Sequence, residues 1–383
     1  MNAPAYDRHN TRLAIDIGGT FTDLALVADD RLTTLKVLTT PKDPSLGVLE
    51  GVAAILETTG LELRQVDLII HGTTLATNAL IERRGAKTAF LTTEGHRDVL
   101  EMAAENRFEQ YDINIDRPEP LVPRYLRLPI RERMNKDGDV LIPLDEKSVD
   151  ACLPVLEREG VESVAIGFLH GYANGDHEER VAAFIAKRRP DLSITLASAV
   201  APEIREFERF STACANAYVR PLMERYLRKL EQEMRQRGLR APIMLMTSGG
   251  GLTTLDIAAR YPIRLVESGP AGGAVFAAHV ARECKTPNVM AFDMGGTTAK
   301  LCLIDDYAPQ HARAFEVDRA YRFKKGSGLP VRVPVIEMVE IGTREDDEDS
   351  EGQEQEREGY EEVQWLGPSG QSERTWELVP AQP

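Results

Sequence analysis

The sequence predicts an α/β protein with two domains of ordinary size. The chain has 383 residues, which is enough for two domains that each bury a core. Short apolar runs alternate with helical patterns along most of it, as expected of an α/β fold. One motif, Asp-x-Gly-Gly-Thr, occurs twice, at Asp16 and at Asp293, and each copy follows an apolar run.

Composition and charge exclude several classes of protein. No apolar run approaches the ~20 residues of a membrane span, and the first ten residues lack the features of a signal peptide, so we expect a cytoplasmic protein without membrane contact. The net charge of −15 argues against nucleic-acid binding. The four cysteines, Cys152, Cys214, Cys284 and Cys302, are scattered and are expected to be reduced core residues.

The two Asp-x-Gly-Gly-Thr stretches predict a strand, a carboxylate, a glycine turn and a second strand, written twice. Adjacent glycines let a backbone approach a ligand closely and expose N–H donors, which suits phosphate groups. A carboxylate at the strand end can hold a hydrated Mg²⁺ ion against those phosphates. An ordinary hairpin turn is the alternative for either copy alone. Neither copy has the ending of a P-loop or the spacing of a dinucleotide turn.

The first part of the chain predicts a meander, a helix and a buried strand. The turn at Asp29 separates two alternating strands, and a helical pattern runs from Ser45 to Gly60. The strand 68–70 then delivers His71 to its carboxyl end, where ligands bind in open α/β sheets. His71 is a candidate for substrate or metal contact, or it is a hydrogen-bonded structural residue. Thr73 and Thr74 are expected to cap the following helix.

The middle of the chain predicts further alternation of strands and helices. The predicted strands are 88–92, 164–168 and 193–197, the helices are 148–159 and 178–188, and 131–140 is a hairpin. Polar residues 94–98 follow the first of these strands. The proline-rich stretch 106–129 reads as a long loop of the kind that forms lids or specificity elements. For His170 and His177 a structural role is favoured over metal binding, because no third ligand is spaced with them.

A domain boundary is expected near Ala201. Beyond it, helical patterns cover 203–217 and 222–237, and Pro221 is expected to break them. Strands are predicted at 243–246 and 263–266, and each meets a glycine-rich turn. The second turn, 267–273, opens an alanine-rich helix that reaches at least His279. Both turns favour anions or a nucleotide edge, or they simply allow close packing.

Five dispersed motifs together resemble the hydantoinase A/5-oxoprolinase family. They are residues 13–23, 71–78, 91–98, 267–273 and 292–300, in the family's order. The paired Asp-Gly-Gly-Thr stretches also resemble the phosphate loops of the actin, Hsp70 and sugar-kinase superfold (ASKHA). That resemblance implies two RNase H-like domains closing on ATP, here an N-terminal domain over 1–200 and a second, incomplete one over 201–342.

The resemblance implies an ATP- and Mg²⁺-dependent subunit that opens a cyclic amide such as 5-oxoproline or a hydantoin. It implies a hydantoinase B-type partner subunit, and His71 as a further catalytic candidate. Asp16 and Asp293 would hold Mg²⁺, with Asp23 as a base or a supporting group. The phosphates would be held by Gly18, Gly19, Thr20, Thr22, Gly295, Gly296, Thr297 and Thr298. A ketone carboxylase of the same family and a non-catalytic product are the alternatives.

The resemblance stops at Gly342, where the family pattern continues into another glycine-rich loop. Residues 343–383 instead form an acidic stretch that is expected to be disordered. This stretch is either a native interaction tail or the result of a lost reading frame, which would leave the family's pattern truncated. The second reading is favoured, because the missing glycine loop should close the cleft.

Overall fold

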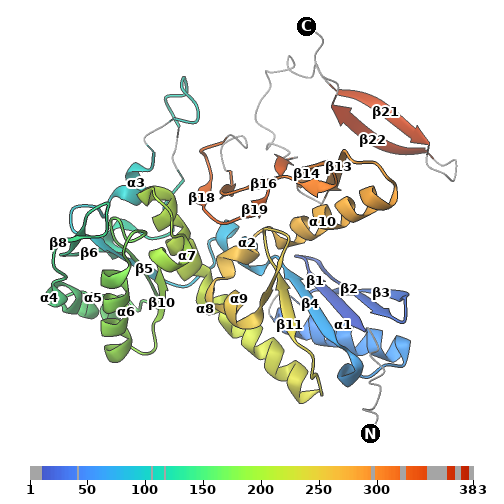
Figure 1. Cartoon of the computed structure of the whole chain (residues 1–383), viewed down its shortest axis with the longest axis horizontal. Coiled ribbons are helices and arrows are strands. Elements are labelled where there is room, and N and C mark those ends of the chain that lie inside the picture. The colour runs from blue at the N-terminus through green and yellow to red at the C-terminus, as the bar shows by residue number, and fades with distance from the viewer. Residues whose placement is uncertain are drawn as a thin grey trace. The chain divides into compact units, whose positions relative to one another are not determined.

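The computed structural model describes residues 11–40, 43–104, 107–115, 118–294, 298–319, 325–342, 360–366 and 372–378. The chain divides into two units, residues 1–342 and 343–383 (Figure 1). In the second unit, β21 (Tyr360–Leu366) and β22 (Ser372–Leu378) pair as an antiparallel hairpin. The disorder expected of residues 343–383 stays a prediction, and the rest of that stretch lies outside the described residues.

A six-stranded mixed sheet forms the centre of the first unit, in the order β12-β11-β4-β1-β2-β3. Its strands are β1 (Arg12–Ile17), β2 (Phe21–Ala28), β3 (Arg31–Leu38), β4 (Leu68–Thr73), β11 (Ile243–Met246) and β12 (Leu252–Thr254). The antiparallel meander β1-β2-β3 confirms the predicted turn at Asp29. β4 and β11 run parallel to β1 and to each other. Strands from both sides of the expected boundary near Ala201 thus share one sheet.

Helices cover one face of this sheet, where its apolar side chains point. The predicted helix near Ser45 is α1 (Pro44–Thr59), and it ends at Gly60, whose positive φ of 69° provides a left-handed cap. The other helical elements of this region are η1 (Leu63–Gln65), α2 (Leu75–Ile81), α9 (Leu255–Arg260) and η3 (Pro262–Leu265). The predicted strand 263–266 is wrong, because its apolar residues form the buried 3₁₀ turn η3 instead.

A second sheet contains four parallel strands, in the order β10-β9-β5-β6. They are β5 (Thr88–Thr93), β6 (Arg127–Ile130), β9 (Ser163–Gly167) and β10 (Ser193–Leu196). Around them lie α3 (Val99–Met102), η2 (Arg124–Leu126), β7 (Arg133–Met134), β8 (Val140–Ile142), α4 (Glu146–Asp150), α5 (Leu153–Arg158), α6 (Asp176–Arg188) and α7 (Ala197–Val200). The expected loop 106–129 is corrected at its end, since η2 and the start of β6 fall within it.

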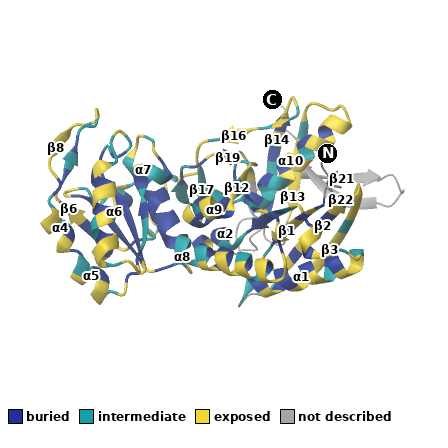
Figure 2. Ribbon diagram, turned by 60° about the horizontal axis from the view of Figure 1, so that its bottom comes forward, coloured by how far each residue is buried: buried dark blue, intermediate teal, exposed yellow. Residues whose placement is uncertain are grey.

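The long helix α8 (Glu206–Gln236) joins the two sheets (Figure 2). Residues 209–219 are buried all round, as expected of a helix that is enclosed on every side. They contribute Phe210 to the core of the four-stranded sheet and Val219 to that of the six-stranded sheet. The predicted break at Pro221 is wrong. The carbonyl of Tyr218, one turn earlier, accepts a hydrogen bond from the N–H of Ala86 at 2.8 Å, outside the helix.

A third, smaller sheet follows helix α10 (Ser268–Glu283). It comprises β13 (Val289–Met294), β14 (Thr298–Asp305), β15 (Ala308–Pro309) and β20 (Val339–Gly342). Short pairs accompany it: β16 (His311–Ala312) with β19 (Val335–Ile336), and β17 (Phe315–Val317) with β18 (Leu329–Val331). One face packs Cys302 and Ile336 against Ala271 and Ala274 of α10.

The other face of the third sheet is apolar and exposed. Strand register and alternation place five exposed side chains on it: Met290, Phe292, Met294, Leu303 and Val339. Apolar patches of this kind mark surfaces that contact other polypeptide. Cys152, Cys214 and Cys302 are free and buried as predicted, whereas Cys284 is exposed, so its assignment to the core was wrong.

Candidate active site

The first Asp-x-Gly-Gly-Thr stretch forms the hairpin β1–β2. Asp16 and Asp23 stand directly opposite each other in its register and point to the sheet face that is not covered by α1. The turn closes with a hydrogen bond of 2.9 Å from the N–H of Gly18 to the carbonyl of Phe21. Lys36 of the next strand pairs with Asp23 at 3.1 Å. Two carboxylates of the first motif therefore face the same side.

Glycines from two other motifs make room for the Asp16 carboxylate. A Cβ atom on Gly72, the last residue but one of β4, would lie 2.6 Å from Oδ1 of Asp16. A Cβ atom on Gly269, in the first turn of α10, would lie 3.8 Å from Oδ2. Any side chain at Gly72 would displace the carboxylate. The motifs around Asp16, His71 and Glu267 therefore meet at one point.

Asp293 of β13 joins the two carboxylates of the first hairpin. Burial, and then the nearby charges of Asp23 and Asp293, raise the pKa of Asp16. Among the described residues, no three His, Cys, Asp or Glu side chains form a ready set of metal ligands. Mg²⁺ usually takes one or two carboxylates and completes its shell with waters and substrate phosphates, so the residues present fit a hydrated Mg²⁺ ion.

The second hairpin, β13–β14, is described in part. Gly295, Gly296 and Thr297 lie outside the described residues, and Thr298 is described only as the first residue of β14. Asp293 stands opposite Lys300 in the register. Lys300 forms an ion pair with Glu267 at the start of α10.

A cleft of about 570 Å³ runs between the uncovered sheet face and α10. Asp16, Asp23 and Lys36 line the sheet side of this cleft. The helix side is lined by Gly269, Gly272, Gly273 and Phe276. The glycines leave the helix surface without side chains, and the N-terminal end of a 16-residue helix favours anions. The arrangement suits a ligand that carries both a flat group and negative charge.

His71 is fully buried, and both of its ring nitrogens are hydrogen-bonded. Nδ1 donates to the carbonyl of Ile15 at 3.2 Å, which leaves Nε2 to accept from the hydroxyl of Tyr226 at 2.8 Å. Burial lowers the pKa of His71 to about 4, so the ring is neutral. This geometry favours the structural alternative for His71 over direct contact with a substrate.

The threonines of these motifs support the backbone of the first turn. Thr22 is fully buried, and its hydroxyl lies 3.0 Å from that of Thr39, which donates to the carbonyl of Gly18. Thr22 therefore faces away from the cleft, unlike the exposed Gly19 and Thr20. Thr74 does not cap α2 with its side chain but donates to the carbonyl of Ile17 at 3.1 Å.

Other candidates from the sequence lie away from this cleft. Residues 94–98 follow β5 in the second sheet, where Asp98 pairs with Arg124 at 2.8 Å. In the same sheet, His177 contacts the buried Glu132 at 2.8 Å. The structure thus brings together four of the five motifs and separates the fifth.

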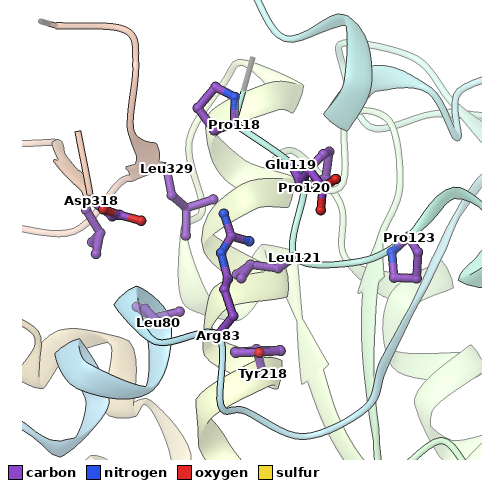
Figure 3. Close-up of a pocket in the computed structure, with 11 residues that line it drawn as sticks. Leu80, Arg83, Pro118, Glu119, Pro120, Leu121, Pro123, Tyr218, Asp318 and Leu329 are labelled. Carbon is purple, nitrogen blue, oxygen red and sulfur yellow. The ribbon is translucent and has the colours of Figure 1, made fainter. Parts of the chain in front are cut away.

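A second hollow of about 490 Å³ lies between the proline-rich segment and β17–β18. Figure 3 shows the side chain of Arg83 rising between Leu121 and Leu329, above the ring of Tyr218. Glu119 and Asp318 also line the hollow. This hollow was not predicted, because its walls come from four separate parts of the chain.

Two sheets joined by α8, with a cleft between hairpin β1–β2 and α10 that Asp16 and Asp23 line, define an α/β protein whose candidate site combines carboxylates with a helix N-terminus. Residues 12–188 match the hydantoinase/oxoprolinase N-terminal region, and residues 209–344 match hydantoinase/oxoprolinase. The chain belongs to the hydantoinase/oxoprolinase family. In the part of the chain that the structure describes, no helix is long and apolar enough to cross a membrane.

Three relatives and one crystal structure support this assignment. The caprolactamase subunit alpha of Pseudomonas jessenii is 36% identical over 76% of this chain and 43% of its own. Its crystal structure superposes with a TM-score of 0.75 at 30% identity, over 95% of this chain and 51% of that one. The acetophenone carboxylase gamma subunit of Aromatoleum aromaticum is 31% identical, with 76% and 42% covered. The 5-oxoprolinase of Saccharomyces cerevisiae is 31% identical, with 79% and 26% covered. The chain spans less than half of each of these three relatives.

Three parts of the site escaped prediction from sequence. Lys36 and Lys300 are ordinary strand residues until the register places them opposite Asp23 and Asp293. The role of Gly72 depends on the parallel pairing of β4 with β1, which sets it beside Asp16. A comparison of the two hairpins, position by position, would have singled out Lys300.

Proposed function

We propose that the chain is the ATP-dependent subunit of an enzyme that opens a cyclic amide of the 5-oxoproline or hydantoin type. The observation that supports this most is the convergence of Asp16, Asp23 and Asp293 beside Gly72 and the first turn of α10. Three carboxylates alone would repel a nucleotide. Together with Mg²⁺ they become a phosphate site, and the relatives include a 5-oxoprolinase and a caprolactamase subunit.

The residues of the cleft divide into three roles in this proposal. Asp16 and Asp293 hold the hydrated Mg²⁺ ion, and Asp23 orients or deprotonates a reacting group. The turn residues Gly18, Gly19 and Thr20, together with Gly295, Gly296, Thr297 and Thr298 of the second motif, hold the phosphates. Thr22 instead supports the turn through Thr39. Bound Mg²⁺ neutralises charge on the phosphates, while the protein mainly positions the reactants.

ATP couples to the reaction by phosphorylating the amide oxygen, which turns a poor leaving group into a good one. The amide oxygen attacks the γ-phosphorus and ADP departs, which leaves the amide carbon open to water. Water adds to that carbon and the ring C–N bond breaks, which leaves an acyl phosphate; a second water hydrolyses this acyl phosphate to a carboxylate and phosphate. The amino nitrogen takes up the proton that the water gives up. A five-membered lactam needs this coupling because its hydrolysis is poorly driven.

We also propose the finer fold and the substrate side. The order β3-β2-β1-β4-β11, a meander followed by parallel strands, supports an RNase H-like domain of the actin, Hsp70 and sugar-kinase superfold. Hairpin β13–β14 would then open the second such domain. The hollow around Arg83, which the proline-rich segment lines, supports a substrate-side role for that segment.

A partner polypeptide belongs to this proposal. The caprolactamase and acetophenone carboxylase relatives are named as subunits, which supports a hydantoinase B-type partner here. The exposed apolar face of the third sheet is a surface that such further polypeptide would cover. We place the working enzyme in the cytoplasm, where ATP is available.

The second candidate is an ATP-dependent ketone carboxylase subunit, which the acetophenone carboxylase relative favours. The two are separated by incubating the chain and its partner with Mg-ATP and one of three substrates: 5-oxoproline, hydantoin, or acetone with bicarbonate. Amide-dependent phosphate release with ring opening supports the first. Ketone-dependent release that needs bicarbonate supports the second. ATP hydrolysis at a rate that none of the three substrates changes contradicts both candidate functions.

A further inference from the structure

The two hairpins of the cleft share one register but differ at one position. In β1–β2, Asp16 stands opposite Asp23. In β13–β14, Asp293 stands opposite Lys300. Lys300 thus occupies the place that Asp23 has in the first copy. Glu267, which pairs with Lys300, directly precedes the cleft-lining residues Ser268 and Gly269, so this difference adds a cation beside the cleft.

Lys300 is held in a fixed position by Glu267. Their ion pair is largely buried, with side chains 18% and 19% exposed. Glu267 itself is constrained, because its backbone has a left-handed φ of 64° and its N–H donates to Oγ1 of Thr77 at 3.3 Å. The next residue, Ser268, donates to the carbonyl of Thr73 at 3.4 Å. The pair is therefore fixed to the junction that also holds Asp16.

Charge balance gives this pair a function. A nucleotide brings several negative charges into a cleft that two carboxylates, Asp16 and Asp23, already line. Lys36 lies on the same sheet face as Asp16 and is already paired with Asp23. Lys300 has a flexible four-carbon stem, and its ammonium group can exchange one carboxylate for a phosphate oxygen.

We propose that Lys300 is a catalytic cation. When a nucleotide binds, the ammonium group of Lys300 releases the Glu267 carboxylate and binds the terminal phosphate instead. Glu267 is the positioning residue that holds Lys300 near the cleft when no nucleotide is bound. This inference rests on the proposed function, since it requires a nucleotide in the cleft. In this proposal, Lys300 lets the site distinguish ATP from ADP.

The test is calorimetric binding of Mg-ATP, Mg-ADP and AMP to the full chain and to its variants. A charged hydrogen bond contributes about 1.5–3 kcal/mol, so Lys300→Met should weaken ATP about ten- to hundredfold more than ADP and leave AMP unchanged. Lys300→Arg should keep most of the preference. Glu267→Gln removes the competing carboxylate, so it should strengthen ATP binding relative to ADP. If the ion pair were merely structural, both single variants would instead bind ATP more weakly.

Two further variants keep the test decisive. Glu267→Gln/Lys300→Met replaces the pair by neutral groups and guards against misfolding from one unpaired buried charge. Lys136→Met removes an exposed charge in the turn between β7 and β8 and should change nothing. An unchanged ratio of ATP to ADP affinity in Lys300→Met overturns this inference alone. No ATP binding by the unmodified chain overturns the proposed function and this inference with it.

Discussion

A Cβ atom on Gly72 would lie 2.6 Å from Oδ1 of Asp16, so these two residues from different strands occupy one shared space. The Asp16 carboxylate fills the gap that the missing side chain leaves. It also touches the start of α10 through Gly269. The site is thus set by the pairing of β1 with β4 as much as by the glycine turn itself.

Replacing Gly72 by Ala should abolish Mg-ATP binding while the fold persists, because the carboxylate can swing toward the open cleft. Gly269→Ala is the matched control, since its Cβ would make only ordinary contact with Asp16 at 3.8 Å. Thermal unfolding with and without Mg-ATP measures both effects. Equal nucleotide-dependent shifts in the two variants would contradict the steric argument.

Replacing Asp16 by Asn should raise the melting temperature of the nucleotide-free chain and remove its response to Mg-ATP. The pKa of Asp16 is raised by burial, Asp23 and Asp293, so its charge is unfavourable in the folded chain without Mg²⁺. A gain on the order of 1 kcal/mol corresponds to roughly 2–4 °C. A lower melting temperature would show that the carboxylate stabilises the fold.

The same raised pKa makes Mg-ATP binding sensitive to acid. Protons compete with Mg²⁺ for Asp16 at a higher pH than for an ordinary aspartate, so affinity should begin to fall at a higher pH than at a site with an unshifted carboxylate. In the nucleotide-free chain, the same protonation is stabilising, because the folded state binds the proton more tightly. Binding isotherms at several pH values test this, and an affinity that does not depend on pH would contradict it.

His71 should make the fold itself acid-sensitive. Its pKa falls from 6.5 in the unfolded chain to about 4 in the fold, so its contribution is fully present above 6.5 and is lost as the pH falls toward 4. Between pH 7 and pH 5 this loss is about 2 kcal/mol. Urea unfolding of the chain and of His71→Gln should differ in pH dependence by that amount. Parallel pH profiles would assign the sensitivity to other groups.

The exposed face of the third sheet should tolerate polar substitutions. Met290 and Leu303 face each other on it and are 58% and 52% exposed, so replacing both by Gln should change stability by about 0.5 kcal/mol or less per residue and reduce self-association. Ile304, the neighbour of Leu303 on the α10 side, is 1% exposed, and Ile304→Gln should destabilise strongly. Light scattering and urea unfolding separate the two effects.

Local patterns predicted the two hairpins and α1 well, because alternation and turn residues there agree with the final packing. The strand 263–266 was wrong because a short apolar run fits a buried 3₁₀ turn equally well. Pro221 lies inside α8 although its missing N–H leaves the carbonyl of Ala217 without its usual helical donor; the packing of α8 against both sheets outweighs this cost. β11 pairs with β4, which lies far away in the sequence, and no local pattern predicts such a pairing.

The carboxylates of the candidate site were predicted, but their supporting residues were not. Asp16, Asp23 and Asp293 belong to a motif that recurs in the sequence. Tyr226, whose hydroxyl donates a hydrogen bond to Nε2 of His71, is 155 positions away along the chain. Such partners become visible only when the fold brings the helices and strands together.

The melting temperature with and without Mg-ATP tests the central claim most directly, namely that the two Asp-Gly-Gly-Thr hairpins form one nucleotide site. Ligand at a hundred times its Kd stabilises by about 2.7 kcal/mol, which raises the transition by several degrees. We predict a shift of this size that requires Mg²⁺ and is lost in Asp16→Asn. No shift at saturating Mg-ATP, in a chain that melts cooperatively, would contradict the assignment of this cleft.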